Sequence, residues 1–291
     1  MIASAPRGPL PTVRTVSELR RVVSGWRSAG ERVALVPTMG ALHRGHLALV
    51  ERGRTFCPRV VASLFVNPTQ FGANEDFSRY PRDEARDAAL LAGAKCDLLY
   101  APDVAEMYPG GFAASVDPGP IAERQCGPFR PGHFAGVATV VSKLLLQSQA
   151  DVALFGEKDF QQLQVIRRVA RDLDIPVAVE GVPTVRESDG LALSSRNVYL
   201  TPGQRAVAPA LYRTLAEMAR RIEAGEGIAE VSAAGLETVR AAGFTSIDYI
   251  DVADAETLRP LERLDRPGRI LCAVWLGKTR LIDNVGVAPK R

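Results

Sequence analysis

Two histidines separated by two residues form the part of the sequence best suited to binding an anion. They lie in the run Pro37-Thr38-Met39-Gly40-Ala41-Leu42-His43-Arg44-Gly45-His46, between a predicted strand and a predicted helix. A spacing of three residues places both imidazoles on one face of the first helical turn, where backbone N–H groups and the helix dipole favour negative charge. Phosphate is the natural ligand of such a position. Gly40 and Gly45 would let the backbone approach it closely, because they have no β-carbon.

Other interpretations of this run stay open. The histidines could instead be a helix cap and a buried packing group, with glycines that serve the turn. A zinc site is disfavoured, because no Cys or carboxylate stands at ligand spacing and the H-E-x-x-H arrangement is absent. Neither of the common glycine-rich nucleotide-binding loops occurs, so the prediction of an anion site at this loop depends on the histidine pair.

A second candidate follows another predicted strand, in the run Gly156-Glu157-Lys158-Asp159. Lys158 is a point charge at a strand-to-helix turn, where it could reach phosphates, although a lysine in a turn is also typical of a solvated side chain. Asp159 could simply cap the following helix, with Gln162 as its capping-box partner.

Two further polar loops complete the candidate set. In Asp189–Asn197, the hydroxyls of Ser194 and Ser195 precede Arg196 and form a compact group of donors for phosphate oxygens. A turn or cap is the alternative, but Thr201 already caps the next helix. In Asn67–Gly72, amides suit a neutral or carboxylate substrate; Asn67 before Pro68 is also an ordinary turn signal, and Gln70 is the better candidate. Whether His133 belongs to a lid or a cap stays open.

The elements that must position these residues alternate between strands and helices. Buried strands are predicted at 33–36, 60–66, 97–100, 152–155 and 177–182, and amphipathic helices at 47–56, 83–92, 136–146 and 160–173. This alternation predicts a Rossmann-like α/β fold with a parallel sheet that binds ligands at the carboxyl ends of its strands. The Gly- and Pro-rich stretch 108–132 is predicted to be a long ordered loop or flap.

After Val185 the pattern changes to that of a smaller α+β domain. A capping box at 201–204 starts a helix predicted to run to about 224, and a second helix is predicted at 228–241. Strands follow at 246–252, 270–276 and 280–285, the last two joined by a hairpin at 277–279. We therefore expect one domain over 1–186 and a second over 187–291.

Composition narrows the class of protein. A chain of 291 residues, 46% of them hydrophobic, is long enough for about two domains with packed cores. A net charge of +3 argues against a dedicated nucleic-acid or membrane-surface protein. Four cysteines without regular spacing, a start at 1–14 that lacks a signal-peptide apolar region, and the absence of a long apolar run predict a cytoplasmic protein with reduced thiols.

In these motifs the sequence resembles the pantothenate synthetase (pantoate:β-alanine ligase) family, within the H-x-G-H nucleotidylyltransferase superfamily. The runs at 37–46, 67–72, 156–162 and 189–197 match in order and spacing, and the resemblance extends from about residue 15 to the end. Arg44 stands where an acidic residue is commoner, and the first fifteen residues have no counterpart. The resemblance implies an ATP- and pantoate-binding first domain, a C-terminal lid, Mg²⁺ dependence and a homodimer.

The resemblance also implies roles for particular residues. Catalytic roles fall on His43, His46, Lys158 and Arg196. ATP would contact residues 37–46, Gly156, Glu157, Lys158, Asp159, Val185, Leu193, Ser194, Ser195 and Arg196. Pantoate would be held by Asn67, Gln70 and Gln162, with β-alanine on the Gln70 side; the metal ligands stay open.

The implied reaction is the activation of pantoate as an adenylate, followed by attack of the β-alanine amine. The rival interpretations are a sister nucleotidylyltransferase, which would leave AMP on its product, and a catalytically dead module that senses nucleotide or binds RNA. The near-neutral charge argues mildly against RNA.

Overall fold

The computed structural model of the chain describes residues 9–72 and 77–290, which form two compact units. The first comprises the described residues up to Pro118, Gly132–Gly156 and Val165–Val182. The second comprises Gly119–Pro131, Glu157–Gln164 and the described residues from Pro183 onward. Residues 1–8 of the N-terminal segment considered above lie outside the described residues.

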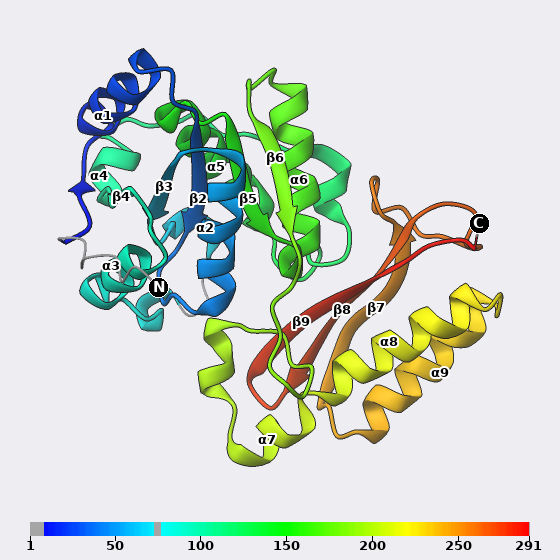
Figure 1. The fold of residues 1–291 in the computed structure, drawn as a ribbon. Helices are drawn as coiled ribbons and strands as arrows, with labels where there is room; N and C mark the ends of the chain where they lie inside the picture. Colours follow the sequence, from blue (N-terminus) through cyan, green and yellow to red (C-terminus); the bar gives the residue numbers. More distant parts are fainter. Residues whose placement is uncertain (1–8, 73–76, 291) are drawn as a thin grey trace, which may run out of the picture. The chain divides into compact units, whose positions relative to one another are not determined.

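The first unit contains a parallel sheet of six strands in the order β1-β4-β3-β2-β5-β6 (Figure 1). The strands are β1 (Thr12–Val13), β2 (Val33–Thr38), β3 (Arg59–Leu64), β4 (Leu98–Tyr100), β5 (Val152–Gly156) and β6 (Ala178–Val182). The central strands are short runs of fully buried Val, Leu and Ala, as expected where helices cover both faces. The strand order reverses between β2 and β5, the position at which open α/β sheets bind ligands.

Helices flank this sheet in the way that the alternating pattern predicts. They are α1 (Val16–Ser28), α2 (Arg44–Phe56), α3 (Glu84–Gly93), α4 (Val104–Met107), α5 (His133–Ser148) and α6 (Phe160–Asp172). Helix α2 packs over β2, β3 and β5, whereas α1 and α5 pack against each other and β2. The predicted Rossmann-like fold class is confirmed, although β1, α1 and α4 were not predicted, and β3 ends at Leu64 rather than at residue 66.

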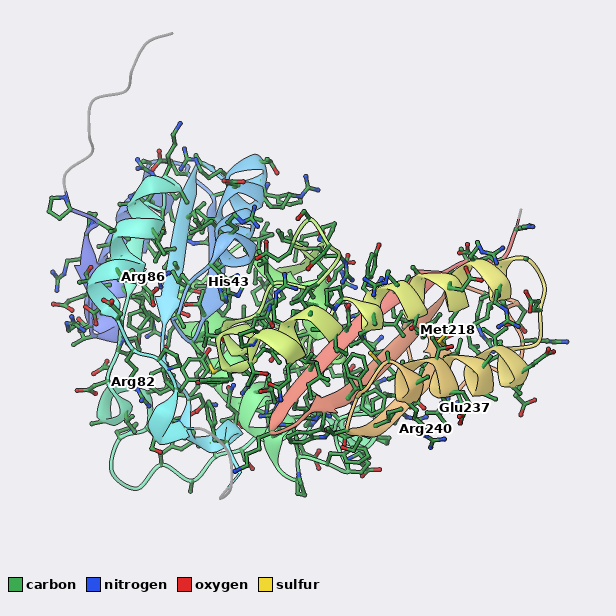
Figure 2. All side chains as sticks on the ribbon, turned by 90° about the horizontal axis from the view of Figure 1, so that it is seen from below. His43, Arg82, Arg86, Met218, Glu237 and Arg240 are labelled. Carbon is green, nitrogen blue, oxygen red and sulfur yellow. The ribbon has the colours of Figure 1, made fainter. Side chains whose placement is uncertain are left out.

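The second unit is built on an antiparallel sheet of β7 (Ser246–Asp254), β8 (Gly268–Leu276) and β9 (Thr279–Val287). Helices α8 (Ala210–Glu223) and α9 (Ile228–Ala241) pack on this sheet (Figure 1). Met218 points from α8 toward α9, where a β-carbon on Gly235 would lie 2.4 Å from its sulfur, while Glu237 and Arg240 form an exposed ion pair (Figure 2). The predicted smaller α+β domain is confirmed.

Two details of this unit follow from local chemistry. The prediction of one continuous helix from 201 to about 224 is wrong, because the chain forms two helices, α7 (Pro202–Val207) and α8. The break falls at Pro209, whose ring nitrogen cannot donate a helical hydrogen bond. The capping box of Thr201 and Gln204 is present as predicted. Leu276 pairs with Thr279, so the hairpin loop is only Gly277-Lys278.

All four cysteines are free and buried, as the sequence predicts for reduced thiols. Burial raises the pKa of the Cys96 thiol to about 11 and also raises the pKa of Cys57. Among residues 9–72 and 77–290, none of the helices combines the length and the apolar character needed to cross a bilayer.

Candidate active site

The two histidines begin helix α2 and cap it reciprocally. His43 is the N-cap residue and accepts the Gly45 backbone N–H at Nδ1 (3.1 Å), while His46 Nδ1 accepts the His43 N–H (3.3 Å). Figure 2 shows His43 at this end of the helix. Because each Nδ1 atom accepts a hydrogen bond, the proton of each neutral imidazole lies on Nε2, which is then a donor. The cap interpretation and the anion-binding interpretation are therefore compatible.

The loop before the histidines is held by a residue that sequence reasoning missed. Asp87 of α3 is fully buried, and its two carboxylate oxygens accept the backbone N–H groups of Ala41 (2.8 Å) and Leu42 (2.9 Å). Gly40 has a φ of +87°, and a β-carbon there would lie 3.1 Å from Asp87 Oδ2. Glycine is thus needed for the turn itself. The signal in the sequence is an acidic residue four positions before Leu91 on the buried face of a helix.

The amide loop contacts the histidine loop within the first unit. Asn67 caps the 3-10 helix Pro68–Gln70 and donates from Nδ2 to Gln70 Oε1 (3.1 Å) and Gly136 O (3.2 Å). Gln70 Nε2 in turn donates to the sulfur of Met39 (2.9 Å), which precedes the histidines. Tyr108 donates from Oη to Asn67 Oδ1 (2.7 Å), so this buried amide pair has a fixed orientation.

His133, whose role the sequence left open, supports Gln70. It is buried at the start of α5, and its Nδ1 lies 2.8 Å from Gln70 O. A carbonyl oxygen only accepts, so Nδ1 carries the proton, the opposite tautomer to that of His43 and His46. Gly136 lets α5 approach this loop, since a β-carbon there would lie 2.5 Å from Thr69 O.

Lys158 lies in the second unit, in the 3-10 helix Glu157–Asp159. Asn284 of β9 donates from Nδ2 to the carbonyl oxygens of Glu157 (2.9 Å) and Lys158 (2.8 Å). The ammonium of Lys158 lies 3.9 Å from the Asp159 carboxylate. Among the described residues, Asp159 accepts no capping hydrogen bond, so the alternative that it caps α6 with Gln162 is wrong.

The run Ser194-Ser195-Arg196 also lies in the second unit, where its 3-10 helix contacts β9. Ser194 caps the 3-10 helix Ser195–Tyr199 by accepting the Arg196 N–H (3.3 Å), so the cap interpretation holds for Ser194. Both this helix and the 3-10 helix of Lys158 pack against β9. Val185 and Leu193 are joined by a backbone hydrogen bond of 3.0 Å at the base of the loop that leads to these residues.

A buried ion pair fixes that loop, and sequence reasoning missed it as well. Arg186 donates to both oxygens of Asp283 on β9 (2.7 and 2.8 Å), and its guanidinium lies 3.8 Å from the ring centroid of Tyr212. Gly190 has a φ of +96°, and a β-carbon there would lie 2.6 Å from the Tyr212 ring. At the loop's exposed tip, Arg205 donates to Asp189 and lowers the pKa of that carboxyl.

Two adjacent glutamines have different environments. Gln161 is buried: Oε1 accepts the Cys126 N–H (3.0 Å), and Nε2 donates to Ile121 O (3.0 Å) and Arg124 O (2.7 Å). Gln162 is half-buried, and within the described part of the chain its side chain makes no hydrogen bond. Gln161 is therefore structural, whereas Gln162 has its amide available for a ligand.

The site residues predicted from the sequence fall into two sets, one in each unit. The first unit brings together the loop 37–46, Asn67 and Gln70. The second brings Glu157, Lys158 and Asp159 onto the strand that also contacts the Ser195–Tyr199 helix. The loop 37–46 follows β2 at the reversal of the strand order, where open α/β sheets of the nucleotide-binding class bind their ligands.

Comparison with known proteins gives the family within this class. The family model for pantoate-beta-alanine ligase matches residues 11–286, and the chain belongs to that family. It is 63% identical to the pantothenate synthetase of Paramagnetospirillum magneticum over 277 residues, covering 95% of this chain and 98% of that protein.

Two solved structures agree with this assignment. The crystal structure of pantothenate synthetase from Thermus thermophilus superposes with a TM-score of 0.91 at 54% identity, covering 96% of this chain and 100% of that one. Pantoate-beta-alanine ligase from Francisella tularensis, complexed with beta-gamma ATP and beta-alanine, superposes with a TM-score of 0.78 at 32% identity, covering 95% and 97% of the two chains. The chain is an enzyme that condenses pantoate with β-alanine to pantothenate in an ATP-dependent reaction.

Proposed function

We propose that this ligase activates pantoate on ATP with the two sets of residues described above. The observation that carries the proposal is the reciprocal cap of His43 and His46, which leaves an Nε2–H donor on each imidazole at the start of α2. Donors there add to the backbone N–H groups and dipole of the helix. Residues 37–46, Gly156, Val185 and Leu193 would contribute further ATP contacts.

The chemistry needs charge compensation more than a base. The pantoate carboxylate is already ionised at neutral pH, so one of its oxygens attacks the α-phosphorus directly and pyrophosphate leaves with the electron pair of the broken P–O bond. Negative charge accumulates on the phosphates during this step. His43, His46, Lys158, Ser194, Ser195 and Arg196 would stabilise it, and such preorganised electrostatic stabilisation is usually the largest catalytic contribution.

Pantoate and β-alanine would be bound by amides. Gln70 and Asn67 are buried and fixed in orientation by their own hydrogen bonds, and Gln162 has its amide available. The Francisella tularensis ligase is described with β-alanine and an ATP ligand together, which supports the same two substrates here. In the second step the amine attacks the acyl carbon, AMP leaves, and the amine proton passes to water or to the substrate, since neither Gln70 nor Gln162 titrates.

Mg²⁺ fits this site as the companion of ATP rather than as a resident ion. Within residues 9–72 and 77–290, no group of three or more His, Cys, Asp or Glu side chains is arranged to hold a metal. Mg²⁺ commonly takes one or two carboxylates and completes its shell with phosphates and water. Asp159, 47% exposed beside Lys158, would be such a carboxylate. When bound, the ion would neutralise phosphate charge.

The remaining expectations concern the whole protein. A homodimer is implied by the family resemblance and is checked by analytical ultracentrifugation. A cytoplasmic location is supported by the four free thiols. Binding of ATP and pantoate by residues 1–186 and a lid role for residues 187–291 stay predictions.

The deciding experiment is isotope exchange without an amine. The enzyme is incubated with ATP, labelled pyrophosphate, Mg²⁺ and pantoate, and label is followed into ATP. Label that enters ATP only when pantoate is present supports the adenylate. Exchange that does not depend on pantoate would contradict this route. So would a lack of exchange in an enzyme that still forms pantothenate in the full reaction.

A further inference from the structure

Strand β9 presents Asn284 to the turn that carries Lys158. Along β9, Leu281, Val285 and Val287 belong to the core with α8 and α9, so the alternate residue Asn284 points to the other face of the sheet. Segments from earlier in the chain contact that other face. Cys126 lies 3.0 Å from Tyr249 Oη, and Asn284 bonds the Glu157–Asp159 turn.

The Asn284 amide is saturated in one orientation. Nδ2 donates to Glu157 O (2.9 Å) and Lys158 O (2.8 Å), while Oδ1 accepts from Arg269 Nε (2.6 Å). Carbonyls only accept and a guanidinium only donates, so a flipped amide would lose all three bonds. The residue is 3% exposed, and an unmet hydrogen bond in such a buried position is costly.

Arg269 of β8 completes the arrangement. Its Nη2 lies 3.2 Å from Glu157 Oε2, and its guanidinium lies 4.3 Å from the ring centroid of Phe160. Burial lowers the pKa of Arg269, and the Glu157 carboxylate opposes that shift. Arg269 thus contacts Asn284 and also Glu157 and Phe160, the residues on either side of Lys158-Asp159.

We propose that Asn284, oriented by Arg269, is the positioning residue for Lys158, and that it sets where the ammonium acts on ATP. The inference rests on the proposed catalytic role of Lys158. The Lys158 side chain is anchored at its backbone, whose position sets the region that the ammonium can reach, and Asn284 holds that backbone through two carbonyl oxygens. An error of about 1 Å in positioning a catalytic group can reduce the rate on the order of 10²-fold.

Variants of Asn284 test this role. Asn284→Asp keeps the acceptor for Arg269 but places an oxygen opposite two carbonyl oxygens, and Asn284→Ala removes all three bonds. We expect pantoate-dependent exchange of pyrophosphate into ATP to fall about 10- to 100-fold at saturating substrates. The KM for pantoate should stay within about 3-fold. If both variants fail to fold, Arg269→Lys, which keeps the charge and loses the forked donor, replaces them.

A double-variant cycle separates positioning from general damage. If Asn284 acts through Lys158, Asn284→Ala should reduce exchange less than about 2-fold further when Lys158 is already alanine. Val231→Ala, a fully buried core change in α9 of the same unit, is the matched control for lost stability. It should leave exchange within about 2-fold of the parent enzyme.

A second measurement needs no activity. The chain has only five lysines, at 95, 143, 158, 278 and 290, so reductive methylation with ¹³C-formaldehyde gives few NMR signals to assign. Asn284→Asp should shift the Lys158 signal in the absence of substrate, and Val231→Ala should leave it in place.

The outcomes are distinguishable. Equal losses from Asn284→Ala in both backgrounds, or an unmoved Lys158 signal in Asn284→Asp, would overturn the positioning role. An unsubstituted enzyme without pantoate-dependent exchange would overturn the proposed adenylation and, with it, the catalytic consequence for Asn284; the lysine signal would then still decide whether Asn284 positions Lys158.

Discussion

The imidazole rings of His43 and His46 lie with their centroids 4.1 Å apart, and each accepts a backbone N–H of the other's helical turn. Each histidine therefore stabilises the start of α2 with Nδ1 and carries its proton on Nε2. A substitution by alanine removes both contributions at once, so a more selective change is needed to separate them.

Glutamine at position 46 separates the cap from the imidazole. Gln is a normal capping-box residue at this helical position, so His46→Gln should keep the stability of the parent within about 0.5 kcal/mol. Pyrophosphate exchange should fall on the order of 10²-fold, because the Nε2–H donor is lost. His46→Ala should show the same loss of exchange and also lose about 0.5–2 kcal/mol in urea unfolding. Exchange within a few-fold of the parent in His46→Gln would contradict a role for the imidazole.

Lys158→Ala should lose on the order of 10²-fold or more in exchange while its unfolding curve stays close to that of the parent. Within the described residues, the ammonium pairs with the Asp159 carboxylate at 3.9 Å, so little stability depends on the side chain. Lys278→Ala in the exposed hairpin turn is the control and should keep full activity. Near-normal exchange in Lys158→Ala would remove Lys158 from the mechanism.

The glutamine pair gives a third test. Gln162→Ala should raise the KM for pantoate more than the KM for ATP and leave stability unchanged, because its amide makes no hydrogen bond within the described residues. Gln161→Ala should instead destabilise the protein by about 1–3 kcal/mol, since it leaves buried backbone groups unsatisfied. A larger effect of Gln162→Ala on ATP than on pantoate would count against a pantoate contact.

Asp87→Asn tests the support of the histidine loop. An amide nitrogen would replace one of the two oxygens that accept the Ala41 and Leu42 N–H groups, so one buried donor loses its acceptor. We expect a loss of about 1–3 kcal/mol in unfolding free energy and weaker exchange. Arg86→Gln removes the 3.7 Å ion pair to Asp87 but keeps the carboxylate, so it shows how much of the loss comes from that pair alone. Unchanged stability in Asp87→Asn would show that the loop does not depend on this carboxylate.

The pH dependence of stability can be tested at Asp251. Burial raises the pKa of this carboxyl in the folded protein, and the hydrogen bond from Gln125 opposes that shift. A raised pKa means that the ionised form costs folding free energy at neutral pH and that the cost disappears in acid. Asp251→Asn should therefore melt higher than the parent at pH 7. The difference should shrink as the pH falls from the raised pKa to the unfolded value of about 3.9. A difference that does not change with pH would contradict this origin.

The elements that the sequence predicted were those with a strong local pattern. Strands β2, β3, β4 and β5 are buried apolar runs, and the helices between them have clear amphipathic spacing. The strand predicted as buried at 177–182 forms as β6, but only Val182 in it is buried, because β6 lies at the edge of the sheet. Helix α1 was missed although Thr15 and Glu18 form a capping box before Leu19 and Val23, its buried residues. Strand β1 has two residues and no local signal, because only pairing with β4 defines it.

The site was predictable where its residues carry their own chemistry. His43, His46, Gln70 and Lys158 stand in loops after predicted strands. Their supporting partners were not predictable, since Asn284 lies 126 residues from Lys158 and no spacing in the sequence connects the two. Asp87 lies 46 residues from Ala41, and Asp283 lies 97 residues from Arg186, so these contacts were not predictable either. These contacts exist only once the sheets have formed.

The neighbours Asp283 and Asn284 point to opposite faces of β9, one toward Arg186 and the other toward Lys158. A strand shifted by a single residue against β8 would exchange the two faces and release both loops together. The two-residue hairpin Gly277-Lys278 is all that separates the paired ends of these strands. The length of that turn therefore sets the alignment of two segments that are far apart in the chain and that we propose to contact the phosphates of ATP.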